Sequence, residues 1–148
     1  MKNKVGRPRK IDTPEQLLEM FQAYKTYVKE NPRYKYVMNQ RSGDMVAEPL
    51  ECPLSIDGFE VYCYNKFECT VEHYLHNTKG AYEDFCSIST HIKREIRQDQ
   101  ISGGMVGQYN ASLTARLNGL TEKVESTIIT EQPLFDFNSS EDKEESNV

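Results

Sequence analysis

The stretch Ile101-Ser-Gly-Gly-Met-Val-Gly-Gln-Tyr-Asn-Ala-Ser-Leu-Thr-Ala-Arg-Leu-Asn-Gly-Leu120 places a glycine-rich break between two helical patterns. Glycine carries an entropic cost inside a helix, so Gly103, Gly104 and Gly107 predict a bend or a close approach of backbones. After the break, Asn118-Gly119 supplies a left-handed cap signal. Before that cap, leucines recur at helical spacing, namely Leu113, Leu117 and Leu120. The stretch therefore predicts a short packed helix with a defined end.

The pattern on the N-terminal side of the break predicts the longest helix of the chain, from Tyr82 to about Ile101. Its apolar positions are Phe85, Ile88, Ile92 and Ile96. Its polar side carries three basic residues, Lys93, Arg94 and Arg97. These three are candidate DNA-binding residues, because in a ring their charge would be repeated around the axis. The simpler interpretation is a solvated face balanced by Glu95 and Asp99.

Another helix is predicted near the start of the chain, from about Pro14 to Glu30. Thr13 is an N-cap candidate, Pro14 suits the first helical position and Gln16 completes a capping-box pattern. One face of this helix is apolar, formed by Leu17, Leu18, Phe21, Tyr24 and Val28. Asn31-Pro32 ends it.

A β-hairpin is predicted over about residues 34–47, where the runs Tyr34–Met38 and Met45–Ala47 flank the turn residues Asn39–Asp44. Glu48-Pro49 is expected to end the second strand. An isolated hairpin is marginal in water, so this one must lean on the helices or pair with a neighbouring subunit.

Two short helices are predicted next, one from Ser55 to about Tyr64 and one from Glu68 to about His76, with helix-turn-helix proportions. The second helix carries Glu68 and Glu72, and carboxylates facing phosphates are repelled. A packing role is therefore favoured over DNA reading for this pair.

These patterns predict a mainly α fold with a small β-hairpin. We expect residues 1–10 to form a basic disordered arm, residues 11–123 a helical core and oligomerisation domain, and residues 124–148 an acidic C-terminal tail. At 148 residues, the chain fits one folded unit with tails.

The order of motifs resembles the small terminase subunits, the DNA-packaging proteins of podovirus-type phages. The matching motifs begin with Thr13-Pro-Glu-Gln-Leu17 and Glu30-Asn-Pro32, continue with Glu48-Pro49 and Leu54-Ser-Ile-Asp-Gly-Phe59, and end with the quoted Gly-rich, Tyr-Asn, Ala-Arg and Gly-Leu segment. The resemblance spans about Ile11 to Lys123. It implies a ring-forming homo-oligomer that binds double-stranded viral DNA at the packaging site and recruits the large terminase subunit, whose ATPase and nuclease do the chemistry.

The charge distribution departs from that family, whose C-terminal end carries basic DNA-binding residues. Here the net charge is −5, and the end is acidic from Asp136 onward. The positive charge gathers at the start instead, in Lys2, Lys4, Arg7, Arg9 and Lys10. Gly6-Arg-Pro-Arg-Lys10 also resembles an AT-hook core, which enters the minor groove of A·T-rich DNA. We therefore expect DNA contact to have moved to this arm, and an unspecific basic tail is the equally weighted alternative.

The acidic tail contains Pro133-Leu-Phe-Asp-Phe137, in which apolar residues interrupt an otherwise polar segment. Leu134, Phe135 and Phe137 are candidates for a docking peptide that binds the large subunit. Packing against the same chain or a neighbouring copy is the competing interpretation.

No catalytic motif is present, so we expect a non-enzyme without a cofactor. Four scattered cysteines, Cys52, Cys63, Cys69 and Cys86, predict reduced and mostly buried thiols. A zinc site built on Cys69, His73 and His76 with Cys52 or Cys63 is disfavoured because no Cys-x-x-Cys pair exists. No apolar run reaches the length of a membrane span, so a soluble protein of the host cell cytoplasm is expected.

Two other functions remain open from the sequence. The helix pair and the arginine arm would suit a small helix-turn-helix or AT-hook-like transcriptional regulator, which predicts a dimer on a short palindrome. A structural adaptor without a DNA role is the third possibility. Measuring the mass of the native assembly would distinguish a ring from a dimeric regulator and from an adaptor.

Overall fold

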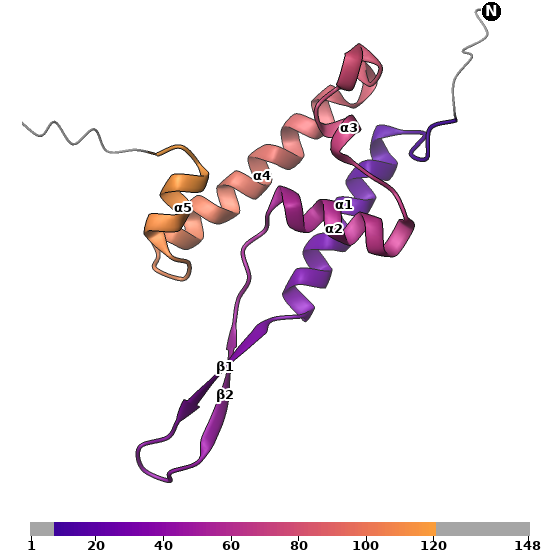
Figure 1. Cartoon of the computed structure of the whole chain (residues 1–148). Helices are drawn as coiled ribbons and strands as arrows, with labels where there is room; N and C mark the ends of the chain where they lie inside the picture. The colour runs from indigo at the N-terminus through magenta and orange to yellow at the C-terminus, as the bar shows by residue number, and fades with distance from the viewer. Residues whose placement is uncertain (1–7, 121–148) are drawn as a thin grey trace, which may run out of the picture.

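The computed structural model describes residues 8–120, which form a mainly helical body and one projecting hairpin (Figure 1). The elements in chain order are α1 (Pro14–Glu30), β1 (Arg33–Met38), β2 (Met45–Leu50), α2 (Ile56–Phe67), α3 (Glu72–Leu75), the 3₁₀ turns η1 (Thr78–Gly80) and η2 (Glu83–Phe85), α4 (Cys86–Met105) and α5 (Ala111–Leu117). The prediction of a mainly α fold with a small hairpin is confirmed.

Helix α1 begins and ends where the sequence predicts. The Thr13 hydroxyl accepts a hydrogen bond from the Gln16 backbone N–H at 3.3 Å, and the Gln16 side chain accepts one from the Asp12 N–H at 2.9 Å. These bonds satisfy N–H groups that a helix start would otherwise leave without partners. Leu17, Phe21 and Tyr24 are buried, so the predicted apolar face is the one that packs.

The core lies where α1 packs against α2 and α4, and where α3 closes one end of α4. Aromatic side chains fill much of it: the rings of Phe21 and Phe59 meet edge to face at 5.3 Å between centroids. Ile92 and Ile96 cover the core from α4, and both are almost fully buried. Burial of these apolar groups is the main stabilising contribution to the fold.

The longest helix is shifted relative to its prediction. It runs from Cys86 to Met105, and the 3₁₀ turn η2 occupies the residues just after Tyr82, where the helix was expected to begin. Gly103 and Gly104 therefore lie inside the last turn of α4 and do not interrupt it. Only Gly107, with φ of +76°, lies in the turn that reverses the chain.

Gly103 and Gly104 are nevertheless sites of close approach, as the sequence predicts. A Cβ at Gly103 would lie 2.1 Å from the Tyr109 ring, and a Cβ at Gly104 would lie 3.1 Å from the Thr114 methyl group. The missing side chains thus let α5 fold back onto the end of α4. Gly103 and Gly104 are needed because the segment that follows α4 packs closely against them. Only Gly107 is needed for the bend of the chain.

Helix α5 starts at the Asn110 cap, whose side chain accepts the Leu113 N–H at 2.9 Å. It ends at Leu117, and Gly119, just beyond its Asn118 cap, is left-handed with φ of +66°. The left-handed cap is confirmed. The expected packing face is not: Leu113 and Leu117 are 58% and 67% exposed, while Thr114 is buried against α4. Helical spacing predicts that Leu113 and Leu117 lie on the same face of α5, but it does not predict whether another segment covers that face.

The hairpin pairs β1 and β2 antiparallel, with Met38 opposite Met45 and Arg33 opposite Leu50. The second strand continues through Glu48 and Pro49, which were expected to end it. Proline is tolerated because each strand of a two-stranded ribbon has one open edge, where no N–H is needed. Figure 1 shows the ribbon extending away from the helices.

The predicted second helix of the helix-turn-helix pair is much shorter than expected. Helix α2 extends to Phe67, Glu68 takes a left-handed conformation with φ of +50°, and α3 is one turn, Glu72–Leu75. The pair therefore differs from helix-turn-helix proportions in its second member.

Candidate functional site

The end of the basic arm is held against the helical body. The Arg9 Nη1 atom lies 2.9 Å from Asp84 Oδ2, and Arg9 Nη2 donates to the Ala81 carbonyl. The guanidinium carbon also lies 5.0 Å from the centre of the Tyr82 ring, which is cation–π range. Arg9 was expected in a free arm, but here its donors are engaged within the protein.

Lys10 and Ile11 continue this attachment. The Lys10 ammonium donates to the Glu68 carbonyl, and the buried Ile11 N–H donates to the Tyr74 hydroxyl at 3.2 Å. The Tyr74 ring packs against the Tyr82 ring, with 4.5 Å between ring centres and a tilt of 53°. Arg9 and Lys10 are thus held on the body, and the remaining candidates Lys2, Lys4 and Arg7 lie outside the described residues.

The basic trio of α4 divides into one structural and two exposed residues. Lys93 is partly buried and donates to the Leu75 carbonyl at 2.7 Å, which satisfies the last turn of α3. Arg94 and Arg97 are exposed. Lys93 therefore serves packing, and only the two arginines remain as candidates for phosphate contact.

The acidic residues expected to balance these arginines have other partners. Glu95 pairs with Lys25 of α1 and lies 3.5 Å from His91. Asp99 accepts the Leu54 N–H at 2.9 Å, and its carboxylate lies 3.4 Å from the Tyr109 hydroxyl. Within residues 8–120, Arg94 and Arg97 are in no ion pair, so their charge faces solvent.

Asp99 is a structural residue that the sequence patterns did not single out. It joins α4 to the segment entering α2 and to the turn before α5. Burial first, and then the negative charge of Asp99, raise the pKa of Tyr109 to about 12. A lone acidic residue on a helix gives no local signal of such long-range bonds.

A DNA-reading role for the helix pair finds little support in its geometry. Val71, Tyr74 and Leu75 are buried, and both Glu60 carboxylate oxygens accept the Val71 N–H, at 3.0 and 3.2 Å. A helix of four residues is about 6 Å long, too short to present several side chains along a major groove. The geometry is that of a packing element, which is the interpretation favoured from the sequence.

The cysteines are poor metal or redox candidates in the described part of the chain. Cys63 and Cys69 are buried, Cys52 is half-buried and Cys86 is exposed. Burial raises the pKa of the Cys63 thiol to about 12, which keeps it protonated. Across residues 8–120, no three His, Cys, Asp or Glu side chains gather as a set of metal ligands.

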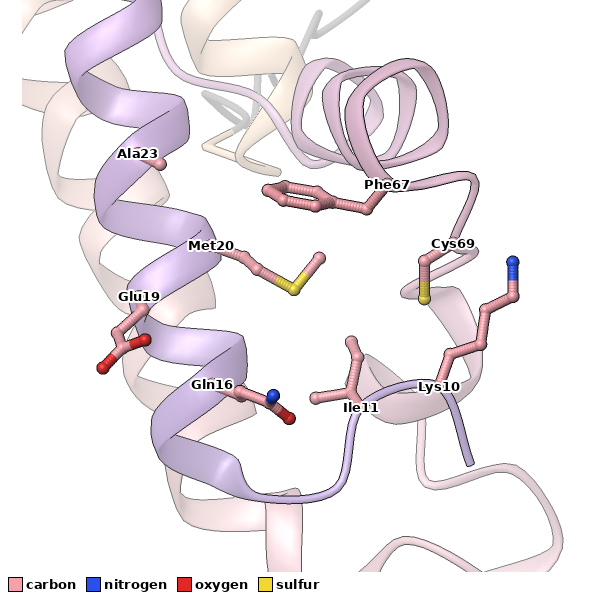
Figure 2. Close-up of a pocket in the computed structure, with 8 residues that line it drawn as sticks. All are labelled: Lys10, Ile11, Gln16, Glu19, Met20, Ala23, Phe67 and Cys69. Carbon is pink, nitrogen blue, oxygen red and sulfur yellow. The ribbon is translucent and has the colours of Figure 1, made fainter. Parts of the chain in front are cut away.

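A groove of about 550 Å³ lies between the first half of α1 and the end of α2 (Figure 2). Its lining residues are Lys10, Ile11, Gln16, Glu19, Met20, Ala23, Phe67 and Cys69. Figure 2 shows Met20, Ile11 and Phe67 pointing toward its centre. The lining offers an apolar floor without a nucleophile–base pair, so it suits an apolar side chain better than a reaction.

Several exposed apolar side chains lie around the junction of α4 and α5. We call this set the elbow patch, and it comprises Met105, Val106, Leu113, Leu117 and Leu120, which are 83%, 76%, 58%, 67% and 49% exposed. Exposed apolar side chains gathered at one junction of the fold are candidates for an interaction surface.

The candidate docking residues Leu134, Phe135 and Phe137 lie outside the described residues. Among residues 8–120, each helix is too short or too polar to cross a lipid bilayer. A scan against protein-family models found no match to this chain, and a search of curated proteins also found none.

Proposed function

We propose that this chain is a non-catalytic small terminase subunit, which forms a homo-oligomeric ring, binds double-stranded viral DNA at the packaging site and recruits the large terminase subunit. The proposal starts from the order of motifs between Ile11 and Lys123. Its setting would be the host cell cytoplasm.

The elbow patch is the observation that carries the proposal. Leu113 and Leu117 follow helical spacing, yet α5 turns Thr114 toward α4 and leaves the two leucines to solvent. Apolar surface exposed on one protomer is stabilised when a second protomer covers it. Self-association through the end of the long helix follows, and it is the property on which a ring depends.

The DNA-binding role rests on charge that the fold leaves available. Arg94 and Arg97 are exposed, and Lys2, Lys4 and Arg7 precede the point where Arg9 attaches to the body. Each copy would contribute a few phosphate contacts, and a ring would combine them by raising the effective concentration of each arm. The acidic tail with Leu134, Phe135 and Phe137 would bind the large subunit.

The competing function, a helix-turn-helix transcriptional regulator, receives less support. It requires a reading helix that protrudes into the major groove, whereas α3 is one turn with Tyr74 and Leu75 buried. A structural adaptor without DNA binding remains the outcome if the basic residues prove dispensable.

Native mass spectrometry over a concentration series, with DNA affinity measured across salt, tests the proposal. We expect a closed assembly larger than a dimer and an affinity that falls steeply with salt. Leu117→Ser should weaken assembly, while the control Ala111→Ser, exposed on the same helix outside the elbow patch, should not. A chain that stays monomeric at high concentration, or a dimer specific for a palindrome, would overturn it.

A further inference from the structure

A groove of about 350 Å³ lies where α2, α4 and α5 meet. Its apolar lining comes from all three helices, namely from Ile56 of α2, Ile96 of α4 and Leu117 of α5. Ile56 and Leu117 are 38% and 67% exposed, so the groove is open to solvent. Of the five residues of the elbow patch, Leu117 alone lines this groove. The groove therefore adjoins the elbow patch without coinciding with it.

The polar lining of the groove leaves one cation available. Lys93 donates to the carbonyl that ends α3, at 2.7 Å, and the Asn118 amide donates to the Gln100 side chain at 2.9 Å. Arg97 also lines the groove, is exposed and is in no ion pair within residues 8–120. Asp57 is the carboxylate of the lining, and the two cations outnumber it. An apolar floor beside an available guanidinium suits a ligand that carries an apolar side chain next to a carboxylate.

The chain itself contains a segment of this chemistry. Leu134-Phe-Asp-Phe137 places Asp136 between two phenylalanines, and further carboxylates follow it. The described residues end at Leu120, three residues after Leu117 of the groove, so the segment is tethered close to this surface. The intervening residues 121–133 can span up to about 45 Å when extended, which exceeds the length of the 20-residue helix α4, about 30 Å. Reach therefore does not limit the contact.

We propose that Leu134, Phe135 and Phe137 dock in this groove of their own chain, with the Asp136 carboxylate on the Arg97 guanidinium. The inference rests on the proposed function and adds regulation to it. The docked tail covers an arginine that contacts DNA and withholds its phenylalanines from the large subunit until either partner displaces it. Because the tail is tethered, its effective concentration is high, and a contact of a few side chains suffices.

Removing the apolar anchors of the tail tests its competition with DNA. In the full chain, the double variant Phe135→Ser/Phe137→Ser keeps the net charge. It should tighten DNA binding about fivefold if the tail occupies the groove about four-fifths of the time, since apparent affinity follows the fraction of open protein. Ile56→Ser should do the same, and combining it with the tail variant should add nothing, because both remove one contact. Ile129→Ser, an apolar residue of the same tail outside the docking segment, is the matched control and should leave the affinity unchanged. Unchanged or weaker DNA binding in the tail variant, or equal tightening in the control, overturns the inference.

Cross-linking identifies the surface that the tail occupies. In a chain whose Cys52 and Cys86 are replaced by serine, Phe135→Cys is combined with Ile56→Cys and treated with a short bis-maleimide. We expect links within one chain, read from the masses of the joined peptides. Pairing Phe135→Cys with Ser42→Cys, exposed in the hairpin turn, is the control and should give few links.

Two cross-linking results contradict the inference. Links mainly between chains would place the tail on a neighbouring copy, and links no more frequent than in the control would mean that the groove is not its site. Both results leave the proposed function standing. That function fails instead if the chain stays monomeric or does not bind DNA.

Discussion

The ring of Tyr109 occupies the space where a side chain of Gly103 would lie, since a Cβ on Gly103 would fall 2.1 Å from Tyr109 Cδ2. Tyr109 follows the turn at Gly107 and carries its hydroxyl to 3.4 Å from Asp99. One glycine thus fixes how closely the chain folds back after α4. The position of α5, and with it the exposure of the elbow patch, depends on this contact.

We predict that Gly103→Ala destabilises the protein although alanine favours helix. The new methyl group would displace the Tyr109 ring, and such overpacking costs about 1–3 kcal/mol, against a helix gain of about 1 kcal/mol. Gly104→Ala is the control, because its Cβ would meet the Thr114 methyl at 3.1 Å and only a small shift is needed. Urea unfolding of both variants measures the difference in their free energies of unfolding. Equal stability of the two would contradict the proposed packing.

Replacing Arg9 should affect stability more than DNA binding. Arg9→Gln loses the Asp84 ion pair and the stacking on Tyr82, together worth about 1 kcal/mol at a partly exposed site. Arg7→Gln, in contrast, should lower the slope of log affinity against log salt by about 0.9 if it removes one phosphate contact. Salt titrations of DNA binding, with thermal unfolding in parallel, compare the two variants. A larger loss of affinity in Arg9→Gln would show that DNA displaces Asp84.

Glu60 should be needed for the turn between α2 and α3. Its carboxylate is the acceptor for the fully buried Val71 N–H, and leaving such a donor unpaired costs about 1–3 kcal/mol. We expect Glu60→Ala to lose that amount in urea unfolding. Glu60→Gln retains an acceptor oxygen and should lose less, so identical behaviour of the two variants would refute this role.

The protein should lose stability progressively above pH 9. The pKa of Cys63 rises from 9.0 to about 12 on folding, and that of Tyr109 rises from 10.0 to about 12. A raised folded pKa means that the unfolded chain releases its proton first, so this stability is intact below pH 9 and is lost between pH 9 and 12. Unfolding free energies measured across this range should fall less steeply above pH 10 in Tyr109→Phe. An unchanged slope would contradict burial of the phenol.

Local features were predictable from the sequence because they depend on neighbours a few residues away. The Thr13 cap of α1, the Asn39–Asp44 loop and the left-handed Gly119 are set by short-range hydrogen bonds and backbone sterics. The start of α4 was placed too early because Phe85, the last residue of the 3₁₀ turn η2, and Tyr82, which caps that turn, continue the apolar spacing of the helix.

The sequence by itself determined the mainly helical class, the caps, the turns and the alternating faces of the hairpin, since each follows from periodicity and local geometry. Only the tertiary structure decided which faces are covered: Arg9 lies on Asp84, Lys93 on the Leu75 carbonyl, and Leu117 in solvent. A periodic pattern specifies the direction of a side chain but not what lies opposite it. That partner is chosen by contacts between segments far apart in the chain, which the free energy of the whole fold selects.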